Sequence, residues 1–406
     1  MSLSFARAAG AVVSVMLASP PLEAQTPVRP TLLEVVAYTL RSNPDLVTAR
    51  LQVDSARGEQ RIARALPNPT FSVTPGSPFQ YSVNQPIDLG PGRVFRMRAA
   101  GQGANAVRLD VQNATRQVVF AARQAFLDLQ LAEAVRDIAF QQDTIVRQLL
   151  RTDSIRFHAG DLAQRDLSTT ELQYVHAEAS LARADAAARG ARIALQVFMG
   201  VPHPDTTFRV SGALVFRPLA FPEDSLRGIA WAERPDIAAA REREEQSRSI
   251  RSLANSLLLP VPGLAAVYQQ TPFDSGKNYA FGLSMTVPVL YWFGGERQKA
   301  AAGARSAEVA SQRTATLAEG DVVAAADNFR AVTTLASRYA SGLLDKARAT
   351  LEMERFAYEH GNASLLELLS AIVAFGDTQT DYYTALHDYW VAAYAIDRAV
   401  GRDLVQ

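Results

Sequence analysis

Apolar side chains recur at alternating steps of three and four residues over residues 365–396, with only Gln379 interrupting the stripe. This spacing predicts a helix whose apolar seam packs on a neighbouring helix, as in a coiled coil. An earlier segment has a row at seven-residue spacing, and its alanines allow helices to approach closely on further faces. The two rows are Leu365, Leu368, Ile372, Phe375, Tyr382, Leu386, Tyr389, Ala393 and Ile396, and Leu167, Tyr174, Leu181, Ala188 and Leu195.

Proline placement shows how far such helices extend. The chain has 20 prolines, and residues 92–201 and 289–406 contain none of them. Because proline breaks helix interiors, these two stretches, which are rich in Ala, Leu, Arg, Glu and Gln, favour long helices. The rest of the chain is rich in loops.

Each proline-free stretch reads as a helical hairpin. We expect one hairpin over about residues 93–199, turning at Gly160, and a second over about residues 296–400, turning at Gly361. Each outgoing arm is predicted as one unbroken helix of about 100 Å, since an α-helix rises about 1.5 Å per residue. Such a length exceeds that of an ordinary globular core.

The two halves of the chain resemble each other. We predict a tandem duplication, with a first repeat at residues 25–200, a Pro-rich connector at 201–222 and a second repeat at 223–406. In the long helical hairpins the matches from Phe157 onward share one offset of 201 positions, which the two earlier motifs do not share. The matches are Asn43-Pro44-Asp45-Leu46 with Arg234-Pro235-Asp236-Ile237, Leu66-Pro67-Asn68-Pro69 with Leu259-Pro260-Val261-Pro262, Phe157 with Tyr358, Gly160 with Gly361, Leu167 with Leu368, Tyr174 with Phe375, and Gly200 with Gly401.

Polar and apolar residues alternate just before each helical hairpin. The pattern predicts β-hairpins at about residues 69–88 and 262–288, with strands of about nine or ten residues, the length that crosses a bilayer when tilted. Four strands cannot close a barrel, and open strand edges in lipid are costly, so membrane strands require several chains. The alternative is a pair of soluble hairpins with aromatic cores. Aromatic residues near the strand ends are Phe79, Tyr81, Tyr268, Phe273, Tyr279, Phe281, Tyr291, Trp292 and Phe293.

Composition narrows the classes of function. The 406 residues include 41 basic and 41 acidic residues and no cysteine. The balanced charge gives no field to attract nucleic acid, and the absence of cysteine excludes disulfides, thiolate sites and a lipid-modified cysteine anchor. At the N-terminus, Arg7, an apolar run and a small residue at Ala24 predict a secretory signal peptide over residues 1–24. Beyond it, no apolar run reaches the length of a membrane-spanning helix.

The combination of motifs resembles the TolC-type outer-membrane efflux proteins. It comprises the NPDL and RPDI helix openings, LPNP and LPVP before paired strands, QPIDLGPGR and VPVLYWFGGER leading into long helices, and the FHAG and YEHG turns. The resemblance implies a mostly α fold with a small membrane β-barrel portion. Each protomer of a homotrimer would give four strands to a twelve-stranded barrel in the outer membrane, and its hairpins would form an α-barrel through the periplasm.

The resemblance also implies partners and site residues. A periplasmic adaptor would dock at the hairpin tips, near Gly160 and Gly361, and an inner-membrane pump would supply the energy. The branch of the family that the chain resembles includes heavy-metal exporters. Glu367 would form a carboxylate ring at the periplasmic gate, and Asp166 and Tyr358 would form a tether that holds the channel closed. The arginine that accompanies this tether in the family is missing. The simpler interpretation of these charged residues is a solvated helix face.

We find no catalytic or cofactor motif. The five histidines include no pair at helical ligand spacing, and the glycine-rich segments lack a phosphate-loop lysine. We therefore expect a passive channel that is not an enzyme and has no cofactor, no bound metal and no nucleic-acid partner. The alternative function is a periplasmic coiled-coil adaptor or scaffold without a channel.

Overall fold

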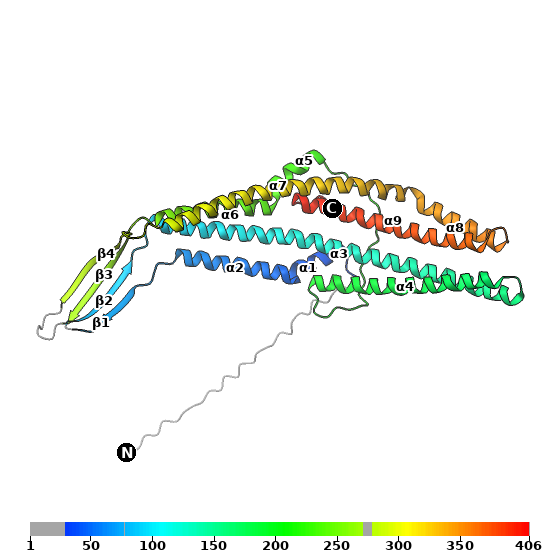
Figure 1. The fold of residues 1–406 in the computed structure, drawn as a ribbon, viewed down its shortest axis with the longest axis horizontal. Helices are drawn as coiled ribbons and strands as arrows, with labels where there is room; N and C mark the ends of the chain where they lie inside the picture. The colour runs from blue at the N-terminus through cyan, green and yellow to red at the C-terminus, as the bar shows by residue number, and fades with distance from the viewer. Residues whose placement is uncertain (1–28, 77, 271–277, 406) are drawn as a thin grey trace, which may run out of the picture.

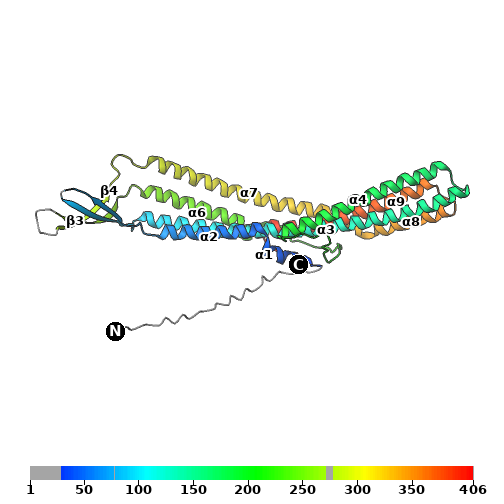
Figure 2. The same cartoon turned by 90° about the horizontal axis from the view of Figure 1, so that it is seen from below.

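The computed structural model describes residues 29–76, 78–270 and 278–405. The predicted signal peptide lies outside the described residues. The molecule is elongated: a small sheet lies at one end, and two helical hairpins point away from it to the other end (Figures 1 and 2). The helices are α1 (Leu32–Ser42), α2 (Pro44–Arg64), α3 (Pro91–Ala159), α4 (Gln164–Met199), α5 (Glu223–Glu233), α6 (Pro235–Ser256), α7 (Gly294–Arg338), the π-helical segment η1 (Tyr339–Leu343), α8 (Leu344–Glu359) and α9 (Leu365–Val400).

The NPDL motif forms the junction between α1 and α2. Asn43 caps α2 by accepting hydrogen bonds from the amides of Asp45 and Leu46, and Pro44 occupies the first helical turn. The amide of the Asn43 side chain and the Ser42 hydroxyl bond to carbonyls at the end of α4. The junction therefore joins the short helices to the returning arm of the first hairpin.

The RPDI motif makes the corresponding junction between α5 and α6 by different chemistry. Arg234 is buried, and its guanidinium pairs with Asp236 and Asp321 and donates to the carbonyls of Ala318 and Ala399. A buried guanidinium is stable here because its donors have acceptors. The junction ties α6 to α7 and to the end of α9.

Four strands form one antiparallel sheet in the order β1-β2-β3-β4. The middle pair joins the two predicted hairpins, since Tyr81 of β2 lies opposite Tyr268 of β3. The strands of the second hairpin have the predicted length, whereas β1 and β2 are shorter than the nine or ten residues expected. The strands are β1 (Thr70–Thr74, 5 residues), β2 (Phe79–Pro86, 8 residues), β3 (Val261–Gln270, 10 residues) and β4 (Asn278–Thr286, 9 residues).

The helices pack lengthwise. Helix α3 runs along α2, α4, α6 and α9, and α7 runs along α6 and α9. The predicted stripe of α9 is largely buried, and Leu386 and Tyr389 are fully so. Small side chains such as Ala392 and Ala393 let these helices approach closely. None of the helices in the described part of the chain combines the length and the apolar character needed to cross a membrane.

One prediction about the helices is wrong. Helix α3 is continuous over 69 residues, but the corresponding arm of the second hairpin is interrupted at Tyr339–Leu343. Ser341 and Gly342 leave helical geometry there, and Gly342 has a φ of +98°. Gly342 is the sequence signal for this interruption. A single Gly is tolerated in many helices, but glycine is also the residue that readily accepts a positive φ.

Candidate gate and channel surfaces

Each helical hairpin turns at a glycine with a left-handed backbone. Gly160 has a φ of +87° and Gly361 a φ of +73°. Next to them, Asp161 N donates to Arg156 O and Asn362 N donates to Ala357 O, both at 2.8 Å, which closes the helix ends. Both turns lie at the end of the molecule opposite the sheet (Figure 1).

A buried carboxylate joins the two hairpins close to these turns. The hydroxyl of Tyr358, on α8, donates to Asp153 Oδ1, on α3, at 2.8 Å. Thr170 Oγ1, on α4, donates to Asp153 Oδ2 at 2.7 Å. Asp153 and Thr170 are fully buried, and Tyr358 is 8% exposed. Hydrogen bonds to a buried carboxylate are strong. Breaking one leaves a carboxylate oxygen without a donor, which destabilises the folded protein.

Burial and the hydrogen bond to Asp153 raise the pKa of Tyr358 to about 12. The phenol is therefore neutral at physiological pH and remains a donor. The Arg156 guanidinium lies 5.5 Å from the centre of the Tyr358 ring. The ring belongs to an apolar cluster whose other buried members are Val146, Leu365, Leu368, Leu369 and Ile372.

The predicted tether between Tyr358 and Asp166 is wrong in its carboxylate. Asp166 lies in the first turn of α4, and its side chain contacts Arg165 with a distance of 3.4 Å between Nε and Oδ1. Its backbone carbonyl lies 3.2 Å from Thr170 Oγ1, one turn further along α4, and shares the single hydroxyl proton that Thr170 also directs at Asp153. Ala363, which stands where the family carries an arginine, packs against the apolar cluster instead.

The sequence carries a signal for Asp153 that lies outside the family motifs. Ala139, Val146 and Asp153 follow one another at seven-residue spacing on the buried side of α3. An acidic residue in an otherwise apolar row indicates a buried partner, since a lone buried charge is costly. The partner itself, on α8, depends on how the second hairpin packs.

Glu367 is placed by the start of α9. Its Oε2 accepts hydrogen bonds from Ser364 N at 2.6 Å and from Ser364 Oγ at 2.9 Å, while Ser364 Oγ accepts from Glu367 N. These reciprocal bonds are a capping box. The hydrogen bonds from the Ser364 amide and hydroxyl lower the pKa of Glu367, so that the exposed side chain is ionised. The capping box accounts for a role of Glu367 in starting α9. A role of Glu367 in the pore stays a prediction.

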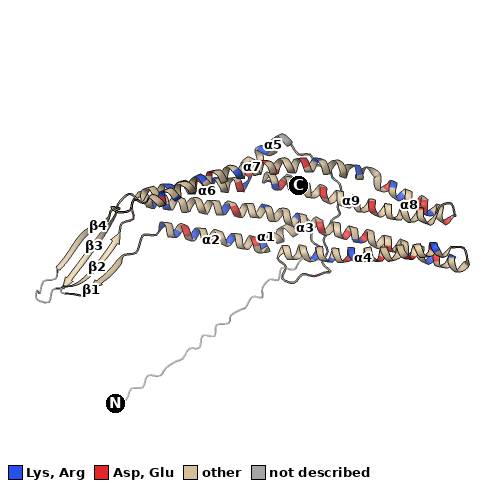
Figure 3. Cartoon of the chain, in the orientation of Figure 1, with Lys and Arg blue, Asp and Glu red and all other residues tan. Residues whose placement is uncertain are grey.

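The sheet has one apolar and one polar face. Its described strands contain no charged residue, as the uniform tan of β1 to β4 in Figure 3 shows. On the polar face, Ser72 and Ser82 are hydrogen bonded at 2.7 Å, and Ser284 reaches Asn84 at 3.3 Å. Phe71, Val73, Tyr81, Val83, Leu264, Tyr268, Tyr279, Phe281, Leu283 and Met285 share the opposite face.

In the described part of the chain, no three His, Asp or Glu side chains are grouped as metal ligands would be. The hydrogen-bonded and ionic groups described above instead hold helices together. The molecule thus has two helical turns at one end and a two-faced sheet at the other.

Proteins of known structure share this fold. The outer membrane channel CmeC of Campylobacter jejuni superposes with a TM-score of 0.80 at 17% identity, covering 98% of this chain and 94% of CmeC. CusC, described as forming a transmembrane channel, gives a TM-score of 0.76 at 18% identity and covers 92% of both chains. In sequence, the cobalt-zinc-cadmium resistance protein CzcC of Cupriavidus metallidurans is 23% identical over 411 residues, covering 99% of this chain and 97% of CzcC.

The match to a family model spans both halves of the chain. The model described as outer membrane efflux protein matches residues 35–201 and again residues 226–402. These ranges include both pairs of strands and both helical hairpins. The chain therefore belongs to the outer membrane efflux protein family and is an efflux channel of the outer membrane.

Proposed function

We propose that three copies of this chain pool their strands into one closed barrel and that solutes pass through it and through a tube made by the helical hairpins. The observation that carries this proposal is the four-stranded sheet. It has an apolar and a polar face, and both edge strands, β1 and β4, have one side unpaired within the described part of the chain. Unpaired backbone groups are costly in lipid, so closure requires strands from further copies.

The helical surfaces support the same assembly. Large apolar side chains on α4 and α7 are exposed in the single chain, including Leu172 at 64% and Val309 at 64%. Exposed apolar surface of this kind is typical of protein interfaces. Neighbouring copies would cover it and complete the helical tube.

Cross-linking tests the closure of the sheet. The chain has no cysteine, so engineered pairs react without background. Ser72 of β1 and Ala280 of β4 lie on the polar face, at opposite edges of the sheet. We expect the double variant Ser72→Cys, Ala280→Cys, treated with a short bismaleimide in outer membranes, to give covalent trimers.

The control uses two central positions. Ser82 and Val267 lie directly opposite each other on β2 and β3 of one chain. The variant Ser82→Cys, Val267→Cys should form the link within the chain and remain a monomer on a denaturing gel. A mixture that stops at dimers, or an outer-membrane form that never links between copies, would contradict the trimeric barrel.

The far ends of the hairpins are the proposed contact with the export machinery. We place the adaptor at the turns around Gly160 and Gly361 and the inner-membrane pump beyond it, so that the pump supplies the energy and the channel is passive. Tyr358 and Glu367 are proposed to act at the gate, with Asp153 in place of Asp166 as the acceptor that holds Tyr358. Their position beside the turns supports this role.

Divalent metal cations are the cargo we propose. The support is the match to the cobalt-zinc-cadmium resistance protein CzcC over nearly the full length of both chains. Cells that lack this channel but keep the neighbouring adaptor and pump should accumulate more zinc, cobalt or cadmium, and the wild-type gene should restore their metal content. Unchanged metal content, together with loss of tolerance to an organic compound, would instead assign a different cargo.

We also propose that the chain arose by tandem duplication. The family model matches once in each half, and each half carries two strands followed by a long helical hairpin. The family membership confirms the predicted outer-membrane location, and it decides against the adaptor or scaffold alternative. The signal peptide remains a prediction.

A further inference from the structure

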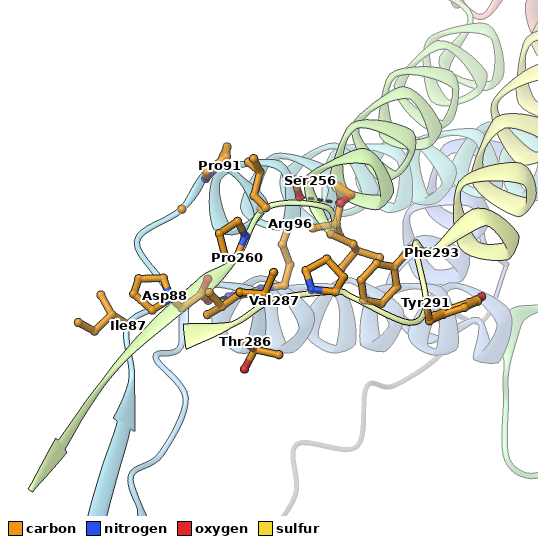
Figure 4. A pocket seen from close by; sticks show the side chains of 18 of the residues that line it. Ile87, Asp88, Pro91, Arg96, Ser256, Pro260, Thr286, Val287, Tyr291 and Phe293 are labelled. Carbon is orange, nitrogen blue, oxygen red and sulfur yellow. Dashed lines mark hydrogen bonds and ion pairs between the residues drawn. The ribbon is translucent and has the colours of Figure 1, made fainter. Parts of the chain in front are cut away.

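A cavity of about 550 Å³ lies where the sheet meets the helices (Figure 4). Its walls come from the ends of α3 and α6, from the start of β3 and from the loop between β4 and α7. Most of its lining is apolar, including Leu253, Leu257 and Val289, and two polar lining residues, Arg96 and Asp88, form a salt bridge with each other. The cavity is therefore built to hold an apolar group beside a polar boundary.

The loop beside the cavity exposes a run of large apolar side chains. Between β4 and α7, Leu290 is 98% exposed, Val289 72% and Trp292 64%. Water-facing proteins rarely expose such a contiguous run, and Trp and Tyr concentrate at the boundary between lipid and water. The loop thus has the composition of a segment that touches a membrane.

The loop also has a fixed shape. Phe293 has a φ of +51°, and no other residue except glycine has a positive φ in the described chain. Its carbonyl accepts the first backbone hydrogen bond of α7, from Arg297 N at 3.1 Å. Tyr291 is held by a hydrogen bond to Glu296 at 2.6 Å. Figure 4 shows the Phe293 ring among the cavity side chains and Tyr291 at the outer edge.

The apolar surface is continuous with the sheet. The loop follows β4 directly, and Phe281, Leu283 and Met285 of β4 are exposed on its apolar face. Because the protein resides in the outer membrane, this face is the one that contacts lipid. The cavity and loop therefore lie at the level where the bilayer ends and the helical part begins (Figures 1 and 4).

Exposed basic residues surround this level. They lie at the ends of α2, α3, α6 and α7 that adjoin the sheet, where basic side chains outnumber acidic ones (Figure 3). In the described chain, no carboxylate lies within ion-pair distance of Arg61, Arg64, Arg251 or Lys299, all of which are exposed. A collar of this charge complements phosphate groups at a membrane surface. The exposed basic members are Arg61, Arg64, Arg98, Arg251, Arg297 and Lys299, whereas Arg57 pairs with Asp54 and Arg248 pairs with Glu244 and Glu245.

We propose that this cavity and the Val287–Phe293 loop form a binding site for an anionic phospholipid of the periplasmic leaflet. An acyl chain occupies the cavity, the loop inserts among neighbouring chains, and the headgroup phosphate contacts the basic collar. The site fixes the depth of the barrel in the membrane and joins the rigid sheet to the helices through a lipid.

Fluorescence quenching tests the contact with lipid. The chain has three tryptophans, and the variant Trp231→Phe, Trp390→Phe leaves only Trp292. The full-length protein is reconstituted in vesicles of phosphatidylcholine mixed with phosphatidylglycerol, with bromine on the acyl chains of one lipid at a time. We expect Trp292 emission to fall about twofold or more with brominated phosphatidylglycerol, and less with brominated phosphatidylcholine at equal mole fraction.

The matched control keeps Trp390 in place of Trp292. Trp390 donates through Nε1 to Val215 O in the helical part, so bromine on the lipid should not quench it. Replacing Arg251 and Lys299 together by Gln should abolish the preference for phosphatidylglycerol while leaving quenching by lipid intact. If brominated phosphatidylglycerol and brominated phosphatidylcholine quench Trp292 equally in the protein that keeps Arg251 and Lys299, the choice of an anionic headgroup is overturned.

A second measurement addresses the cavity. Leu257→Phe reduces the space, and we expect less phosphatidylglycerol to co-purify with the trimer, by mass spectrometry of extracted lipid. Leu51→Phe makes the same change on an exposed face of α2 outside the cavity and should retain the lipid. Retention in both variants would overturn the cavity as the acyl site.

The competing occupant is a neighbouring copy of the chain. If the neighbour covers the loop, Trp292 will not be quenched, and a cysteine at position 290 in the variant Leu290→Cys will be protected from a water-soluble maleimide in detergent-solubilised trimers. That pair of results would overturn the lipid site. None of these measurements depends on efflux, so they separate this inference from the proposed transport function.

Discussion

At the residue scale, the link near the hairpin tips depends on one buried carboxylate. Asp153 accepts from Tyr358 and from Thr170, and no ion pair of Asp153 lies within the described residues. Two neutral donors therefore compensate for its burial. Such a link is strong while both donors are present and is weakened when either is removed.

Removing the Tyr358 donor should loosen the tip. We expect Tyr358→Phe to destabilise the protein by about 1–3 kcal/mol, the cost of leaving a buried acceptor unmet, and to raise open-channel conductance in planar bilayers. Tyr174→Phe is the control, since that ring packs in the same cluster and its hydroxyl forms no hydrogen bond to a described residue. Wild-type conductance in Tyr358→Phe would exclude the link from the gate.

The same tyrosine predicts a dependence on alkaline pH. Its pKa is about 12 in the folded protein against an ordinary value of 10.0. The stability that the bound proton contributes is fully present below about pH 10 and is lost as the pH rises towards about 12. Unfolding midpoints measured across this range should fall more steeply in the wild type than in Tyr358→Phe.

Glu367 offers a way to separate charge from capping. Glu367→Gln keeps an oxygen that can accept the Ser364 hydrogen bonds but removes the charge, whereas Glu367→Ala removes both and should cost about 0.5–2 kcal/mol. If the carboxylates form a ring in the pore, both variants reduce cation preference equally in reversal-potential measurements. If only Glu367→Ala changes the currents, Glu367 acts by capping the start of α9.

At the scale of elements, the two long arms differ although they come from corresponding parts of the chain. Helix α3 is unbroken, while the second arm changes to π-helical geometry at Tyr339–Leu343. Tyr339 Oη also reaches Asp381 of α9, at 3.3 Å. The interruption therefore permits α8 to leave the direction of α7 and follow α9 to the tip.

Substituting glycine in this arm should have opposite effects at two positions. Gly342→Ala forces a Cβ onto a φ of +98° and should destabilise the protein by about 1–2 kcal/mol. Gly303→Ala, inside α7 with open space around it, should stabilise it by about 0.5–1 kcal/mol. Spin labels on Val309→Cys and Met353→Cys would report the α7–α8 distance, which should change only with Gly342→Ala.

At the scale of the whole molecule, the two faces of the sheet decide how it meets lipid and solute. Successive strand residues point to opposite faces, so neighbours such as Ser82 and Val83 face different surroundings. The polar face carries hydroxyl and amide groups without charge in the described strands. A passage lined in this way would impose little preference for ion sign by itself.

A lysine placed on each face tests this arrangement. Ser82→Lys should assemble normally and shift the reversal potential towards anion preference, because in the proposed trimer three added charges line the passage. Val83→Lys should reduce outer-membrane assembly, since a lysine facing lipid near the bilayer midplane costs about 2–4 kcal/mol. Normal assembly of Val83→Lys, with altered currents, would mean that the faces are assigned in reverse.

The sequence by itself determined the local elements and the family. Proline placement and apolar periodicity predicted the two helical hairpins, alternation predicted the paired strands, and glycine predicted the turns at Gly160 and Gly361. These features follow from backbone sterics and from residue spacing within one element. They need no knowledge of what lies beside that element.

The tertiary structure decided the contacts between elements. It replaced Asp166 by Asp153 as the partner of Tyr358, bent the second arm at Gly342, and assembled apolar residues from three separate segments around the cavity below the sheet. Each of these depends on side chains far apart in the sequence that meet only after the helices have packed. Residue spacing fixes which face a side chain occupies, and packing alone selects the neighbour on that face.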